Sequence, residues 1–262
     1  MNTFELSYNA LMSSNVSEKI ELTNSLYKLC QNNELHYKEG FSIKEIESPG
    51  RPDKPNLVRF QNVPKRDNSD IGMIKTIHAI CHIEFNAINL ALDAVYRFRD
   101  MPDKFYQDWI RVAFEEAKHF SLINQYLNDL NYKYGDFDAH NGLWVMTFDT
   151  GYDVLSRMAL VPRVLEARGL DVTRNIQNRF VVSKFSRMVD ILDIIFQDEI
   201  GHVKIGNHWF NTLCKERGLE PLIIFEKLIK KHIGSKLRGP FNLEARKLAD
   251  FSKAELEYLQ AS

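Results

Sequence analysis

The chain has 262 residues, enough for one large domain or two small ones with a substantial buried core. Its formal net charge is −1, so no global electrostatic field favours nucleic acid or an anionic membrane as a partner. Its three cysteines are scattered along the sequence, which argues against a disulfide framework and fits a reducing compartment.

The first residues have neither a basic region nor an apolar core, so we expect no signal peptide. No uninterrupted apolar run approaches the ~20 residues needed to span a bilayer. These two features predict a soluble, cytoplasmic protein with no membrane partner.

Residues 1–69 are expected to hold one or two short helices and then an extended strap. Leucines recur at loose helical spacing up to about residue 48. The segment 49–68 contains Pro49, Pro52, Pro55 and Pro64, and each proline fixes φ and removes a backbone donor. We therefore predict that this segment is irregular and lies over the helices that follow.

Two long helices are predicted next, over residues 70–99 and from Asp103, as N-cap, to about residue 130. Glu84 lies on the apolar stripe of the first helix, and Glu116 and His119 lie on that of the second. Positions i and i+3 share one face of a helix, so Glu116 and His119 point to the same place. An antiparallel hairpin would bring Glu84 to a comparable height.

The second half repeats this arrangement. Residues 131–142 are predicted to cross the bundle, and a third helix over 143–168 carries Glu166 and ends at Gly169. Glu199 and His202 lie on a fourth helix that is predicted to begin near residue 186, after a short helix or excursion over 172–184. The excursion is inferred because a turn at Gly169 would not bring the two glutamates level. Gly201 and Gly206 are expected to permit close approach of a neighbouring helix or a substrate.

The two halves together give the pattern Glu, Glu-x-x-His, Glu, Glu-x-x-His. Glu84 precedes Glu116 by 32 residues, and Glu166 precedes Glu199 by 33. A carboxylate on an apolar face is costly to bury unless a charged group meets it. The pattern is that of four-helix bundles that bind two iron or two manganese ions through carboxylates, so we predict an all-α bundle with such a centre. The predicted metal ligands are Glu84, Glu116, His119, Glu166, Glu199 and His202. The alternative is a buried network of salt bridges without metal.

Other polar residues are weaker candidates. Arg157 and Arg163 are either surface charges or residues that support the site, and Arg163, one turn before Glu166, is placed to orient that carboxylate. His140 and Trp144 are candidates for the mouth of a pocket. His78 and His82, which do not share the face of Glu84, are expected either to be structural or to orient a metal ligand, rather than to be ligands themselves.

The region after residue 214 is predicted to be a helical tail. It contains many basic residues between 227 and 247, which predict either a solvated helix face or a patch for a phosphate-bearing partner. Ser252 and Glu255 have the spacing of a capping box and predict the start of a last short helix.

Several of these runs resemble a known family. His82-Ile83-Glu84, the stretch from Phe114 to Phe120, the stretch from Pro162 to Asp171, and the stretch from Gln197 to His202 are similar to the ferritin-like family catalogued as domain of unknown function 455. Pro49-Gly50-Arg51-Pro52 and Gly239-Pro240-Phe241-Asn242 extend the similarity over most of the chain. The resemblance implies one ferritin-like domain over residues 1–262, with the bundle over 70–214 and a tail over 215–262, and a di-metal site built from the same six ligands.

Three functions are compatible with this pattern. The first is a di-iron or di-manganese oxidase or monooxygenase that activates O2 for a substrate and takes electrons from a donor, neither of which the sequence specifies. By similarity of the ligand layout to the di-iron hydroxylase that modifies an adenosine in tRNA, a tRNA substrate is a sub-hypothesis. The second is a ferroxidase or peroxide-detoxifying iron protein. The third is a scaffold with a structural metal, although structural sites tend to be closed.

Overall fold

The computed structural model describes residues 1–38 and 40–261, and over this range the chain is helical with no named strand. The predicted all-α class is confirmed, and the helices are compatible with a helical bundle. The chain divides into two compact units, Met1–Phe148 and Asp149–Ser262, which are described separately below. The assignment of one domain over 1–262 stays a prediction. None of the described helices is both long and apolar enough to cross a membrane.

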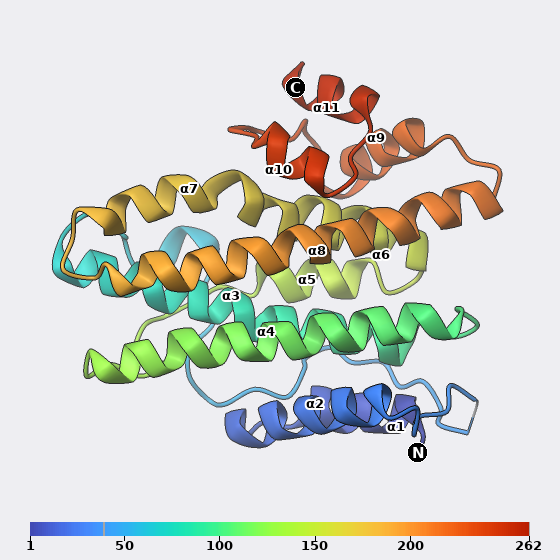
Figure 1. Ribbon diagram of the computed structural model, residues 1–262, viewed down its shortest axis with the longest axis horizontal. Coiled ribbons are helices and arrows are strands. Elements are labelled where there is room, and N and C mark those ends of the chain that lie inside the picture. The colour runs from blue at the N-terminus through green and yellow to red at the C-terminus, as the bar shows by residue number, and fades with distance from the viewer. Residues whose placement is uncertain (39, 262) are drawn as a thin grey trace. The chain divides into compact units, whose positions relative to one another are not determined.

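The first unit is built on a hairpin of two long helices, α3 (Asp70–Arg97) and α4 (Asp103–Asp129), which run side by side in Figure 1. Both were predicted to within two residues. Asp103 is not the N-cap as predicted, because Pro102 occupies that position and makes no side-chain cap. Asp103 is instead the first helical residue, where its negative charge interacts favourably with the positive end of the helix dipole.

Two short helices, α1 (Thr3–Met12) and α2 (Val16–Gln31), pack against this hairpin. The fully buried Lys19 of α2 connects the two short helices, because its Nζ donates to the carbonyls of Ala10 and Leu11 of α1, at 2.9 and 2.6 Å. The same Nζ donates to Oδ1 of Asn89 on α3, at 2.8 Å. A buried lysine therefore caps the end of α1 and ties it to the hairpin.

The strap after α2 is irregular, as predicted, apart from the short 3₁₀ turn η1 (Phe60–Asn62). Its backbone is held at Leu57, which forms an isolated bridge with Ala139. Trp144, on α5 (Gly142–Asp149), donates its indole N–H to the carbonyl of Glu47 at 2.9 Å. The strap and the loop before α5 therefore hold each other in place.

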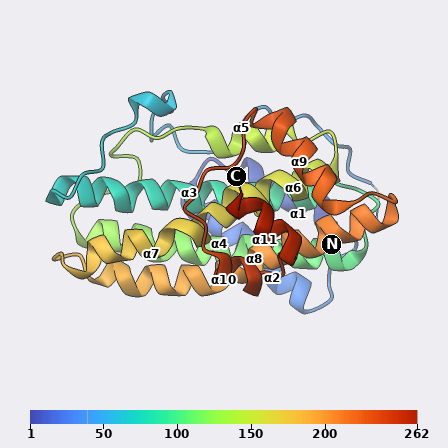
Figure 2. The same ribbon diagram turned by 90° about the horizontal axis from the view of Figure 1, so that it is seen from above.

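The second unit is a hairpin between an interrupted helix and the long α8 (Arg187–Glu216). The interrupted helix consists of α6 (Val154–Leu160), the π-helix η2 (Val161–Glu166) and α7 (Ala167–Val181). Figure 2 shows α7 and α8 running side by side. The tail adds α9 (Pro221–His232), α10 (Leu243–Leu248) and α11 (Lys253–Gln260), of which α10 packs on α7 and α8.

The predicted third helix over residues 143–168 begins within one residue of the expected position, at Gly142, but its continuity and its end were predicted wrongly. The chain breaks its helix at residues 150–153, and the later helix passes through Gly169 to Val181 without the predicted excursion over 172–184. A Cβ at Gly169 would meet nothing within 4 Å, so this glycine does not mark a turn. Glu166 precedes the end of α7 by 15 residues, and Glu199 follows the start of α8 by 12, so a simple hairpin brings them to similar heights. The start of α8 was predicted correctly, with Ser186 as its N-cap residue.

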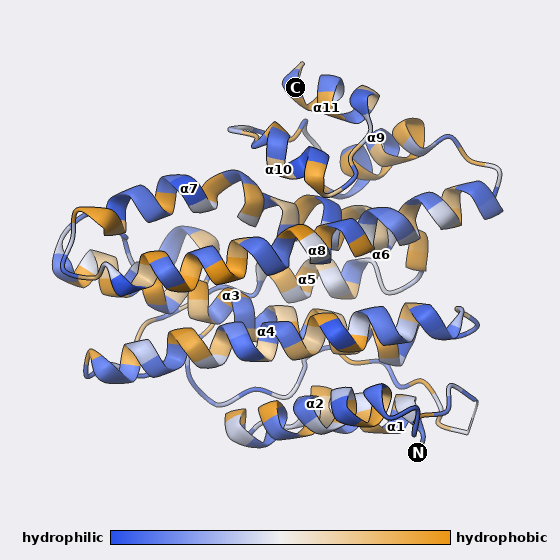
Figure 3. Cartoon of the chain, viewed as in Figure 1, coloured by the Kyte–Doolittle hydropathy of each residue, from blue (hydrophilic) through white to orange (hydrophobic). Residues whose placement is uncertain are grey.

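The π-helix has a cause in the sequence. Pro162 has no N–H, and its ring would clash with the carbonyl four residues earlier in a regular α-helix. The backbone widens instead, and the N–H of Ala167 bonds the Pro162 carbonyl five residues before it. A Cβ at Gly206 on α8 would overlap the Pro162 ring, so this glycine permits the close helix approach that its position predicted. In Figure 3, hydrophobic and hydrophilic residues alternate around α4 and α8, as expected of amphipathic helices.

Candidate metal centre

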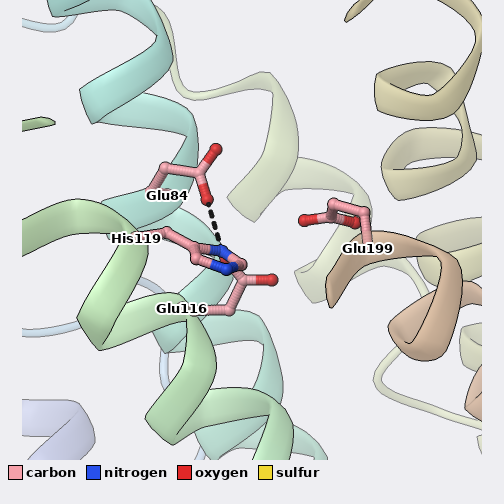
Figure 4. Close-up of side chains that lie close together, drawn as sticks. All are labelled: Glu84, Glu116, His119 and Glu199. Carbon is pink, nitrogen blue, oxygen red and sulfur yellow. Dashed lines mark hydrogen bonds and ion pairs between the residues drawn. The ribbon is translucent and has the colours of Figure 1, made fainter. Parts of the chain in front are cut away.

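The first unit brings three of the predicted ligands together. Glu84 comes from α3, and Glu116 and His119 come from successive turns of α4; all three side chains are buried. Nδ1 of His119 lies 3.3 Å from Oε2 of Glu84 and 3.3 Å from Oε2 of Glu116. Figure 4 shows the Glu84 carboxylate directed at the imidazole ring. One ligand atom from each residue lies within 4.8 Å of the others.

The spacing of these atoms suits a shared cation. Charge-assisted N–H···O bonds are usually ~2.7–2.9 Å long, shorter than either contact of His119. Two ligands at right angles on one ion, with bonds of ~2.1 Å, lie ~3 Å apart. Two carboxylates and an imidazole are also a donor set that iron and manganese accept. The three residues therefore fit a metal in both spacing and chemistry.

The second unit repeats the pair. Glu199 and His202 are buried on α8, and Nδ1 of His202 lies 3.6 Å from Oε1 of Glu199. Glu166 is buried as the last residue of η2, and η2 packs against α8. The two units thus each contain a Glu-x-x-His pair in which the imidazole Nδ1 faces the carboxylate of its own pair.

Three of the six predicted ligands, Glu84, Glu116 and His119, therefore form a buried group within the first unit that could hold a metal ion (Figure 4). The roles of Glu166, Glu199 and His202, and the number and identity of the ions, stay predictions.

Three aromatic side chains of the first unit pack against one another. Phe85 and Phe120, which directly follow Glu84 and His119, have ring centroids 5.6 Å apart, and each contacts the ring of Tyr134. The Tyr134 hydroxyl lies 2.9 Å from Nδ1 of His82. Burial lowers the pKa of His82 to about 4, so this imidazole is neutral at pH 7. The three rings and the neutral His82 therefore form one packed cluster, and the Lys19 Nζ lies 5.7 Å from the centroid of Phe85.

His78 is buried and accepts a hydrogen bond from the Gly135 N–H, so its interactions are those of a structural residue. The two candidates for a pocket mouth both make backbone hydrogen bonds. Trp144 donates to the carbonyl of Glu47, just before the strap, and Nδ1 of the half-buried His140 accepts from the N–H of Gly142 at 3.1 Å.

The two arginine candidates are both buried in the second unit. Arg157 donates from Nε to the Thr150 hydroxyl at 2.8 Å, so it is not a surface charge. Arg163 donates from Nε to Asn207 at 2.5 Å and forms an ion pair with Glu255 of α11. Arg163 therefore links η2 to the C-terminal tail.

The sequence pattern did not predict that Asn207 and Glu255 would be the partners of Arg163. Ser252 and Glu255 form the predicted capping box, which gave the only signal at that position. Not every basic residue of the tail faces solvent, because Arg246 is buried and its guanidinium donates to the Asp171 carboxylate at 2.9 and 2.7 Å.

Comparison with known proteins agrees with the resemblance noted above. The family model described as "Protein of unknown function (DUF455)" matches residues 12–257. The chain is 46% identical over 261 residues to a Haemophilus influenzae protein named "Uncharacterized protein", covering 95% of this chain and 91% of that one. No solved structure matches the chain. A family match of this extent, together with a relative of this similarity, shows that the chain belongs to the DUF455 family.

Proposed function

We propose that the protein is a non-haem di-metal oxidoreductase that uses two iron or manganese ions to activate O2 toward an organic substrate. In this proposal the first unit supplies Glu84, Glu116 and His119, and the second supplies Glu166, Glu199 and His202. The proposal therefore joins the ligands of both units in one centre, of the ferritin-like type.

The observation that carries the proposal is the repeated pair. In both units a buried imidazole turns Nδ1 toward the carboxylate three residues earlier, at 3.3 Å for His119 and 3.6 Å for His202. Isolated buried salt bridges have no reason to recur with the same residue types, spacing and nitrogen atom. A centre with two similar metal positions accounts for the repeat.

The residues of the chain would perform several tasks in this reaction. Four carboxylates offset the charge of two divalent ions, and two imidazoles leave coordination positions open. Bound in this set, two such ions supply the electrons that reduce O2. Each imidazole must present an unprotonated Nδ1 to bind a metal ion. Glu84, Glu116 and His119 are all buried, so the fold would keep bulk water away from the reaction on the first unit's side.

Oxygen uptake by protein reconstituted with Fe(II) under anaerobic conditions tests this function. We expect a single slow phase of O2 consumption, stoichiometric with bound iron, that a Glu116→Ala variant lacks and a Glu115→Ala variant retains. Glu115 is the matched control because it is the neighbouring acid and lies 3.8 Å from Arg111 on the helix surface. Rapid oxidation of many Fe(II) per chain, with ferric mineral as product, would instead identify a ferroxidase.

A further inference from the structure

The carboxylate of Glu166 lies on the least regular helical segment of the second unit. It is the last residue of the π-helix η2, and the backbone returns to α-helical bonding at the next residue. A π segment is rare and is usually retained where surrounding contacts favour it over an α-helix. A return to i→i−4 bonding would rotate the later side chains about the helix axis, so the direction of Glu166 depends on what holds η2.

The first point of attachment lies three residues before Glu166. Arg163 is fully buried, and it forms an ion pair with the buried Glu255 of α11. Its guanidinium carbon lies 4.0 and 4.1 Å from the ring centroids of Phe210 and Phe225. A buried charge that loses its partner is strongly unfavourable, so Arg163 and Glu255 constrain each other.

Asn207 joins the same attachment to α8. Its Oδ1 accepts from Nε of Arg163 at 2.5 Å, and its Nδ2 donates to the Ala249 carbonyl at the end of α10 at 2.5 Å. At the residue before it, Gly206, an added Cβ would overlap the ring of Pro162, so the ring lies directly over this glycine. Within η2, Pro162 therefore packs against α8, and Arg163 bonds both α8 and the tail.

The second point of attachment lies five residues after Glu166. Arg246 of α10 forms a two-point ion pair with Asp171 of α7, at 2.9 and 2.7 Å, and both side chains are buried. Asp171 also accepts from the backbone N–H of Asn242, at 2.9 Å. The tail thus holds the chain on both sides of Glu166.

We propose that the tail residues 242–260 act as a clasp that orients Glu166, and that Glu255 is a positioning residue for this ligand. The inference rests on the proposed function, because it assigns Glu166 to the metal centre. Glu255 needs no contact with metal or substrate for this role. It acts through Arg163 and the π-helix.

Glu255→Gln tests the clasp, because it removes the charge and keeps the shape of the side chain. Glu257→Gln is the matched control on the same helix, with an exposed carboxylate 3.6 Å from Lys253. A second variant, Arg163→Met/Glu255→Leu, removes the ion pair without leaving a lone buried charge, and so guards against a variant that fails to fold.

The first readout is hydrogen exchange of the amides of residues 161–169 in metal-free protein. We expect at least tenfold faster exchange in Glu255→Gln and in the double variant, and no change in Glu257→Gln. The second readout is titration with Co(II), followed by visible absorption. The parent should bind two Co(II) per chain, and both ion-pair variants should bind one of them at least tenfold more weakly.

Two contrary results can be told apart. Unchanged exchange, or two Co(II) bound with parental affinity by both folded variants, would overturn the clasp and leave the metal centre standing. A parent that binds no Co(II) would overturn the proposed function, and with it the metal-orienting role of Glu255.

Discussion

At the scale of single residues, His78 is an imidazole that burial keeps neutral and that accepts a backbone hydrogen bond. Its Nε2 accepts from the backbone N–H of Gly135 at 2.9 Å, and its ring packs against Tyr134 and Phe137. Burial lowers the pKa of His78 to about 4, with a smaller opposing effect from Asp136. Protonation at Nε2 would break the bond that holds the loop after α4.

This geometry predicts a pH-dependent stability. The unfolded chain binds a proton at His78 below about pH 6.5 and the folded chain does so only near pH 4, so stability falls as pH drops through this window. The contribution is ~1.4 kcal/mol per pH unit, and about 3 kcal/mol in all. His78→Gln keeps an acceptor for Gly135 but cannot be protonated there. Urea unfolding between pH 7 and pH 4 should show a shallower loss for the variant, and equal slopes would contradict this role.

Some functional residues could be predicted from the sequence and others could not. The Glu-x-x-His pairs could be recognised because two residue types at one spacing recur on apolar faces, and the structure buries both pairs. Glu255 was recognisable only as a capping-box residue. One of its oxygens does bond Ser252, but the other pairs with Arg163, 92 positions away. No local pattern encodes that second contact.

At the scale of helices, the close contact between η2 and α8 depends on a missing side chain. Gly206→Ala would place a Cβ against the ring of Pro162. We expect a loss of about 1–3 kcal/mol in unfolding free energy, since neither helix can move without disturbing Arg163 and Asn207.

Gly169→Ala is the matched control, because Gly169 lies within α7 and an added Cβ would meet nothing within 4 Å. That variant should gain roughly 0.5–1 kcal/mol from higher helix propensity. Thermal unfolding of both variants measures the difference. Equal effects of the two substitutions would show that the approach of η2 to α8 is not close.

The third helix explains why element boundaries were harder to predict than the ligands. Gly169 and Pro162 are the residues that normally end or bend a helix, and the sequence therefore predicted an end at Gly169. In the structure Pro162 widens the helix into η2, and packing against α8 carries it past Gly169. Tertiary contacts decided an outcome that local propensity alone could not.

At the scale of the whole molecule, the proposed function requires the two compact units to contribute matching halves of one metal centre. Each unit has its own helical hairpin and its own buried Glu-x-x-His pair. The all-helical class and the family could be predicted from the sequence, because long amphipathic periods and extended motifs specify both. The substrate could not, since it depends on surfaces that no ligand motif describes.

Metal content tests this claim most directly. Untagged protein from iron-replete cells should contain close to two iron or manganese ions per chain, a Glu116→Ala/Glu199→Ala variant should contain almost none, and Glu115→Ala should match the parent. Retention of metal by the double variant would show that the ions bind elsewhere. A parent without metal, which also takes up no Fe(II) under anaerobic reconstitution, would mean that the six residues form a buried polar network and that the oxidoreductase proposal is wrong.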